Sequence, residues 1–186
     1  MHIVLVRHGE PNYQNVTERR FIGHGRDLAE LTCDGIKQAE TASKDDRLNG
    51  AELIVSSPYT RALQTAAIIS KNTGLDIKIE TDLHEWIPDI TFQFDSDDYA
   101  IEAAHECHEF QGVHKKECKY HWEDLSTVSE RAYQCLYKYL DYKKIIVVSH
   151  GIVMRQFVFQ NKIPYCGILE IEFSLDTKWK GFIRDK

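Results

Sequence analysis

Arginine and histidine follow two short apolar segments of this sequence at the points where those segments end. Residues 2–6 are followed by Arg7 and His8, and residues 145–149 are followed by His150. A neutral imidazole nitrogen is a nucleophile that can attack phosphorus. A planar guanidinium presents paired N–H donors that match phosphate oxygens and stays charged at any working pH. These residue types together indicate phosphate chemistry.

Three further residues extend this set. Arg61 follows the apolar run 52–56 and a Ser-Pro pair, in the first turn of an expected helix. Gly151 follows His150 and opens another expected helix, whose backbone N–H groups favour an anion. Glu85, at the end of the region after Ile77 to Ile79, is a candidate general acid that would protonate a leaving alkoxide.

Elements that bring these side chains together can be predicted from hydrophobic patterning. Short, β-branched apolar runs predict buried strands at residues 2–6, 52–56, 145–149 and 169–175. Helical spacing predicts a helix after Thr32, with Ile36 and Ala39 facing inward. A second helix is expected from Ser57-Pro58, with the serine as N-cap and the proline at the first helical position. A third is expected from Ser126 or Thr127, where Thr127 and Glu130 can form a capping box. Strands that alternate with helices predict an α/β fold, a three-layer α/β/α sandwich around a mostly parallel sheet. In such sheets ligands bind beyond the carboxyl ends of the strands, so the polar strand tips should converge there.

Two segments depart from this alternation. Residues 88–124 are polar and rich in His, Glu and Lys with little regular period, which predicts a helical or irregular cap over the domain. The tail EIEFSLDTKWKGFIR predicts a hairpin at a sheet edge, with its turn at Asp176 to Lys178.

Composition narrows the class of protein. The 186 residues suit one domain, residues 1–186, and 42% hydrophobic with 28% charged residues is typical of an ordinary globular chain. A net charge of −6 argues against nucleic acid as a partner, and no apolar run is long enough for a membrane helix. Five scattered cysteines without a secretory leader favour a reducing, cytoplasmic location. The Cys and His residues of segment 107–121 lack the regular pairs of a zinc site, so no metal is expected.

Four motifs in order resemble the histidine phosphatase superfamily, the phosphoglycerate mutase-like family, on its phosphatase branch. They are RHGE at 7–10, SSPYTRALQTA at 56–66, LHEW at 83–86 and SHGIVMR at 149–155. RFIG at 20–23 and LTCDGIKQAE at 31–40 are similar to the segment that the family has between the first two motifs.

The resemblance implies a role for each matched residue. His8 would be the nucleophile, with Arg7 and Arg61 as phosphate ligands, His150 as a second phosphate-facing histidine and Glu85 as the acid. The substrate-binding set would also take in Gly151, Gly23, Asn12 and Gln14, the last standing where many relatives have an asparagine.

The function expected from this resemblance is hydrolysis of a small phosphorylated metabolite through a phosphohistidine, without a metal or other cofactor. A phosphoglycerate mutase-like phosphoryl transferase is the first alternative. The second is a non-catalytic protein that binds or senses a phosphorylated ligand. The edge strand near the C-terminus would allow a homodimer. The substrate is not identified by these motifs, because the cap that contacts it matches no subgroup.

Overall fold

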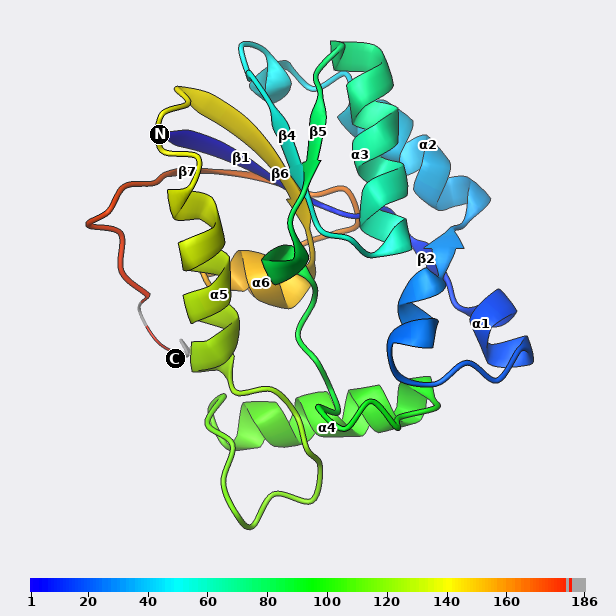
Figure 1. Cartoon of the computed structure of the whole chain (residues 1–186). Coiled ribbons are helices and arrows are strands. Elements are labelled where there is room, and N and C mark those ends of the chain that lie inside the picture. The colour runs from blue at the N-terminus through cyan, green and yellow to red at the C-terminus, as the bar shows by residue number, and fades with distance from the viewer. Residues whose placement is uncertain (180, 182–186) are drawn as a thin grey trace.

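A five-stranded mixed sheet forms the centre of the protein, here described from a computed structural model in which residues 1–179 and 181 are described (Figure 1). The strand order is β5-β4-β6-β1-β7, with β1, β4, β5 and β6 parallel and β7 antiparallel to β1. The strands are β1 (His2–Arg7), β4 (Ile54–Ser56), β5 (Ile77–Ile79), β6 (Lys144–Ser149) and β7 (Ile168–Glu172). A small second sheet pairs β2 (Pro11–Asn12) with β3 (Glu30–Leu31).

Helices cover both faces of the sheet. They are α1 (Gln14–Glu18), α2 (Cys33–Ala42), α3 (Thr60–Thr73), α4 (Asp97–Glu109), α5 (Leu125–Tyr137) and α6 (Gly151–Arg155), with 3₁₀ turns η1 (Gly23–Leu28), η2 (Asp46–Leu48) and η3 (Thr81–Leu83). On β1, Ile3 and Leu5 pack in a core with α5 and α6, whereas Val4 and Val6 pack in a second core with α2 and α3. Successive side chains of a strand point to opposite faces, so a strand apolar at every position is buried on both sides. The predicted three-layer α/β/α architecture is therefore confirmed.

Two predicted helix starts are wrong, and in each case a different residue caps the helix. Helix α3 begins at Thr60 with Tyr59 at the N-cap, and the Ser57 side chain is used elsewhere. Helix α5 begins at Leu125, because the Asp124 carboxylate accepts the backbone N–H of Ser126. Thr32 caps α2 as predicted, by accepting the Gly35 N–H.

The inward direction predicted for Ile36 on α2 is also wrong, since its side chain is 38% exposed. Ala39, three residues later, is fully buried as predicted. At the other end of the chain, β7 ends at Glu172 and a turn forms around Leu175 and Asp176. The returning strand of the predicted hairpin lies largely outside the described residues.

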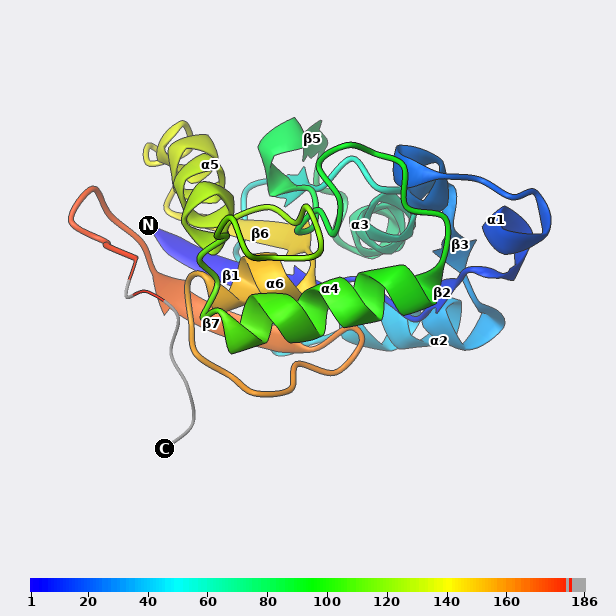
Figure 2. The same ribbon diagram turned by 90° about the horizontal axis from the view of Figure 1, so that it is seen from below.

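Residues 88–124 contain one regular element, α4, which lies beyond the carboxyl ends of the strands in both views (Figures 1 and 2). Only Ala103 and Cys107 of its 13 residues are buried, which explains why the segment shows little periodicity. Trp122 anchors the end of the segment in the core, with its indole N–H donated to Glu106. Within the described residues, no helix combines the length and apolarity needed to cross a bilayer.

Candidate active site

The polar residues after β1, β4 and β6 lie side by side because the strands are hydrogen-bonded in register. The His8 N–H donates to the Ser149 carbonyl at 3.0 Å, and the Ser57 N–H donates to the Val148 carbonyl at 3.0 Å. His8 and His150, each the first residue after its strand, therefore meet with ring centroids 5.1 Å apart. The predicted convergence of strand tips is present, at the end of the sheet where α4 lies (Figure 1).

His8 is held in one tautomer. Its side chain is buried, and Nδ1 lies 2.7 Å from the carbonyl oxygen of Gly9. Because a carbonyl only accepts, Nδ1 carries the proton and Nε2 keeps its lone pair. Burial, followed by the charges of Arg61 and Arg7, lowers the pKa of His8 well below its usual value, against the bond to Gly9. The ring is thus neutral at pH 7, with a nucleophilic nitrogen.

Glycine at position 9 is required by packing. A Cβ there would lie 2.6 Å from the carbonyl oxygen of Gly35 on α2, closer than any side-chain carbon can approach. The Gly9 N–H also donates to the Thr65 hydroxyl on α3 at 3.0 Å. Helices α2 and α3 therefore hold the Gly9 backbone in place, and the Gly9 carbonyl fixes the His8 ring.

Three buried side-chain nitrogens of the described residues have no hydrogen-bond partner: Arg7 Nε, Arg61 Nε and His150 Nδ1. Buried donors are nearly always paired, so a group of unpaired ones in one place indicates a candidate binding site. The Arg7 guanidinium is anchored by its Nη1 bond to the Ile163 carbonyl at 2.6 Å. Arg61 contributes the largest charge effect on both histidines. Two guanidinium donors and one imidazole donor around a neutral nucleophile form a receptor for an oxyanion.

His150 is oriented by Ser57, a residue that the sequence interpretation did not assign to the site. The Ser57 hydroxyl lies 2.7 Å from His150 Nε2, and it also accepts the Tyr59 backbone N–H at 3.3 Å. The hydroxyl hydrogen is then available for Nε2, which leaves the proton of the neutral ring on the unpaired Nδ1. Complete burial, with Arg61 and His8 next, lowers the pKa of His150 well below its usual value. His150 is thus a neutral ring whose Nδ1 proton has no partner among the described residues.

Glu85 lies at the edge of the cleft on a segment that α5 holds in place. Its two carboxylate oxygens accept the backbone N–H groups of Trp86 at 2.9 Å and Ile152 at 3.3 Å. Arg131 of α5 donates to the carbonyls of three residues in this segment, Asp82 at 2.6 Å, His84 at 2.8 Å and Glu85 itself at 3.3 Å. Arg131 is a second residue of the candidate site that the sequence motifs do not indicate.

Arg61 has a carboxylate beside it. Asp27 of η1 accepts from Arg61 Nη1 at 3.2 Å and lies 3.2 Å from His24 Nδ1. The Tyr59 ring lies 5.0 Å from the Arg61 guanidinium carbon, and the Tyr13 ring lies 5.9 Å from it. This arrangement orients the guanidinium, whose Nε has no hydrogen-bond partner among the described residues.

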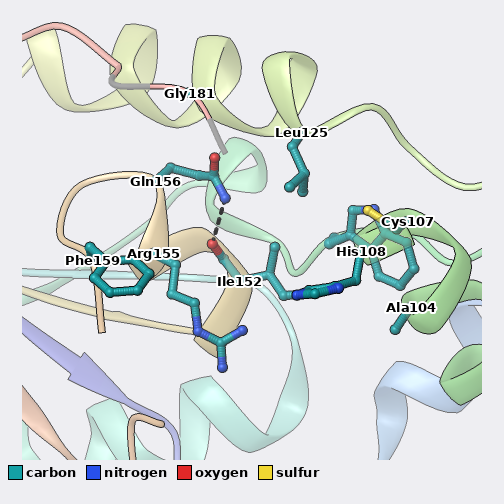
Figure 3. A pocket seen from close by; sticks show the side chains of 10 residues that line it. Ala104, Cys107, His108, Leu125, Ile152, Arg155, Gln156, Phe159 and Gly181 are labelled. Atoms are coloured by element: carbon teal, nitrogen blue, oxygen red, sulfur yellow. Dashed lines mark hydrogen bonds between the residues drawn. The ribbon is translucent and has the colours of Figure 1, made fainter. Parts of the chain in front are cut away.

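A cleft of about 150 Å³ adjoins this centre at Arg61 and Glu85, whereas Arg7, His8 and His150 are not among its lining residues. It is lined by residues of the η1 turn, the Glu85 segment and the α4 segment: Tyr13, His24, Arg26, Asp27, Tyr59, Arg61, Glu85, Trp86, Ile87, Pro88, Phe92, Phe94, Asp97 and Ala100. A second pocket, of about 160 Å³, lies across Trp86 and is lined by Arg155, Ile152 and Gln156 among others (Figure 3). The predicted cap thus supplies one wall of the cleft.

The remaining predicted site residues lie at different places. Gly151 adjoins Arg7, since a Cβ there would lie 3.6 Å from Arg7 Nε. Gly23 has φ +50° and donates its N–H to the Phe94 carbonyl, so it contacts the cap rather than the histidines. Asn12 accepts the Gln14 backbone N–H, and the exposed Gln14 side chain donates to Glu18. Neither of these two side chains lines the cleft; the residue between them, Tyr13, does.

Cysteine and histidine side chains of the α4 segment do not gather. Among the described residues, no group of three or more His, Cys, Asp or Glu side chains is placed to hold a metal ion. Burial raises the pKa of the Cys107 thiol to about 12, so that it stays protonated at neutral pH.

Comparison with known families agrees with this geometry. The sequence profile of the histidine phosphatase superfamily (branch 1) matches residues 3–164. This chain belongs to the histidine phosphatase superfamily. The motif residues described above all lie within the matched range.

Individual relatives are more distant. A probable phosphoglycerate mutase, GpmB, of Salmonella paratyphi C is 35% identical over 85 residues, which cover 46% of this chain and 38% of that protein. The chain therefore spans well under half the length of the curated relatives that it matches. Among solved structures, YhfR of Bacillus stearothermophilus has a TM-score of 0.68 at 22% identity, with 98% of both chains covered. A mycobacterial glucosyl-3-phosphoglycerate phosphatase has a TM-score of 0.67 at 19% identity, with 91% of this chain and 88% of that chain covered. At these identities the structural similarity establishes the fold.

Proposed function

We propose that this protein is a phosphomonoesterase that hydrolyses a small phosphorylated metabolite through a phosphohistidine at His8. The observation that carries the proposal is the free Nε2 of a neutral His8 next to three unpaired buried donors, on Arg7, Arg61 and His150. A phosphoryl group bound by those donors has its phosphorus within reach of the nucleophile. No resident metal is part of the proposal, because two arginines supply the positive charge.

The reaction has two steps. The His8 Nε2 lone pair attacks phosphorus, the bond from phosphorus to the ester oxygen breaks, and the leaving alkoxide takes a proton from the Glu85 carboxyl. Water then gives a proton to the Glu85 carboxylate and attacks the phosphohistidine. The P–N bond breaks, and inorganic phosphate and neutral His8 are released. Arg7, Arg61 and His150 stabilise the charge on the equatorial oxygens in both steps.

A direct test is to trap the intermediate. Rapid quench with a ³²P-labelled ester should give an acid-labile, base-stable adduct on the wild-type protein and none on His8→Ala. His105→Ala, which changes an exposed histidine on α4, is the matched control and should label normally. Hydrolysis of p-nitrophenyl phosphate should persist in the presence of a chelator. An active enzyme that accumulates no adduct under any quench condition would contradict the proposal.

Glu85 has its own test. The Glu85→Gln variant should lose the alkaline limb of the pH profile of kcat, because an amide cannot give up a proton to the leaving oxygen, while KM changes little. A profile identical to that of the wild type would remove Glu85 from the mechanism.

Because the chain is similar to GpmB, a phosphoglycerate mutase-like transferase is a second candidate for its function. A mutase would move the label from one phosphoglycerate hydroxyl to another faster than it releases inorganic phosphate. A third outcome, binding of phosphorylated ligands without either reaction, would identify a non-catalytic protein.

A further inference from the structure

The wall of the cleft that would contact the leaving group is aromatic. Five of the residues that line the cleft carry aromatic rings: Tyr13, Tyr59, Trp86, Phe92 and Phe94. His24 adds an imidazole that lies over Phe92, with ring centroids 4.4 Å apart. Aromatic side chains favour flat apolar partners, which stack on the rings or pack against their edges.

The cations of the cleft are already paired. Arg26 is 3% exposed, donates to the Asp95 carbonyl at 2.9 Å and pairs with Asp97 at 2.5 Å. His24 pairs with Asp27 at 3.2 Å. Arg61 faces the phosphoryl position of the proposed function. The lining that the structure describes therefore offers no spare cation to a second anionic group on a substrate.

Carboxylates on the same wall add repulsion. Asp27 and Asp97 line the cleft beside the cations that they pair with, and the Asp97 side chain remains 55% exposed despite its pairing with Arg26. Charges a few ångströms apart near a protein surface still interact by more than the thermal energy. A carboxylate on the leaving group would meet this wall, whereas a neutral or cationic group would not.

The cleft also extends beyond the phosphoryl position. A third pocket, of about 410 Å³, shares His24, Asp27, Tyr59, Ile87 and Phe92 with it and adds Leu28, Pro58, Thr60, Thr81 and His84. The two spaces adjoin at the shared residues, and the added lining combines two apolar residues with two threonines and a histidine. The combined space suits a leaving group larger than a three-carbon acid.

We propose that the substrate is a phosphomonoester whose leaving group is aromatic and carries no negative charge, such as an aryl or benzyl-type alcohol. This inference rests on the proposed phosphatase function and goes beyond it by naming the class of leaving group. It separates the chain from enzymes that act on phosphoglycerate, whose carboxylate needs a cation. Arg155 lines the neighbouring pocket (Figure 3), which shares Trp86 with the cleft, and it is the cation that the tests below must exclude.

A matched ester series tests the charge preference. Benzyl, 4-carboxybenzyl and 4-(aminomethyl)benzyl phosphate have leaving alcohols of similar reactivity and differ mainly in charge. We expect kcat/KM for the benzyl and aminomethyl esters to exceed that for the carboxybenzyl ester by about tenfold or more, at low ionic strength, and the difference to shrink with added salt. 3-Phosphoglycerate should be slower than benzyl phosphate.

The aromatic preference is tested with Phe92→Ala, a change at a side chain that is 39% exposed and so leaves the core intact. The ratio of kcat/KM for benzyl phosphate to that for ethyl phosphate should fall by about tenfold. Ile101→Ala, at an exposed position on α4, is the control and should leave the ratio unchanged.

Faster hydrolysis of the carboxybenzyl ester or of 3-phosphoglycerate than of benzyl phosphate would overturn the inference while leaving the proposed function intact. If the Arg155→Ala variant then lost this preference for the carboxylate-bearing ester, Arg155 would be the cation responsible. If no ester is hydrolysed and His8 is never labelled, the proposed function fails instead. Calorimetry then still decides the inference, because benzylphosphonate should bind more tightly than 4-carboxybenzylphosphonate. Equal or reversed affinities would refute it.

Discussion

Ser57 provides the sharpest test of how the second histidine works. Its hydroxyl is the partner of His150 Nε2 at 2.7 Å, and both residues are fully buried. In Ser57→Ala the ring loses the bond that fixes its tautomer, and a buried acceptor is left unpaired. Such a loss costs about 1–3 kcal/mol. If the cost is felt in the transition state, kcat falls by about 5-fold to about 150-fold.

The adjacent serine supplies the control. Ser56 is also fully buried, but its hydroxyl donates to the Ser57 carbonyl at 3.0 Å and not to a histidine. Ser56→Ala should therefore lower the melting temperature about as much as Ser57→Ala, by roughly 2–4 °C per kcal/mol for a chain of this size, without the loss in kcat.

The assay is steady-state hydrolysis of benzyl phosphate, with kcat and KM determined separately and melting followed by circular dichroism. For Ser57→Ala we expect the effect mainly in kcat, because the His150 donor matters most when charge develops on the phosphoryl oxygens. Equal kcat values for the two alanine variants would refute the role of Ser57 in orienting His150.

Three other predictions concern stability and the cap. Gly9→Ala should lower the melting temperature more than Gly74→Ala, because its Cβ would meet a backbone oxygen at 2.6 Å, whereas Gly74, at φ +74°, has nothing within 4 Å; equal melting temperatures would contradict this. His2 is hydrogen-bonded to two carboxylates of β7, which raises its pKa above 6.5, so its stabilisation is present below that pH and lost as the pH rises through the raised pKa. Urea unfolding of His2→Gln and wild type at pH 5.5 and 8.5 should therefore differ more at pH 5.5. Arg26→Met should raise KM several-fold with little change in kcat, since the cap loses its tie to η1; an unchanged KM would show that the tie is dispensable.

Much of the catalytic centre was predictable because it depends on strand ends. A strand that is buried on both faces is apolar throughout, so the first polar residue after it is conspicuous, and parallel pairing brings such residues to one edge. His8 and His150 lie at such strand ends, whereas Arg61 lies in the first turn of the helix that follows β4. Glu85 was harder, as its position depends on Arg131, which lies 46 residues away in the sequence and carries no local signal.

The cleft wall was not predictable in the same way. Its contacts join segments far apart in sequence, such as Arg26 with Asp97, which are 71 residues apart. Helix α4 buries only two of its residues, so it leaves almost no hydrophobic period to detect. The same limit applies to Asn12 and Gln14, which the sequence assigned to the substrate-binding set. Tyr13, which lies between them in the sequence, lines the cleft instead.

The two halves of the cleft are attached to the body by different residues. The cap is joined to η1 through Gly23 and Arg26, whereas the Glu85 segment is held by Arg131 from α5. Grafting a foreign loop and helix in place of residues 92–120 would thus alter which alcohols are accepted while sparing the groups that cleave the ester. In the proposed enzyme, the cap is therefore the part to exchange when a different alcohol is to be accepted, and the residues at the strand ends can be kept.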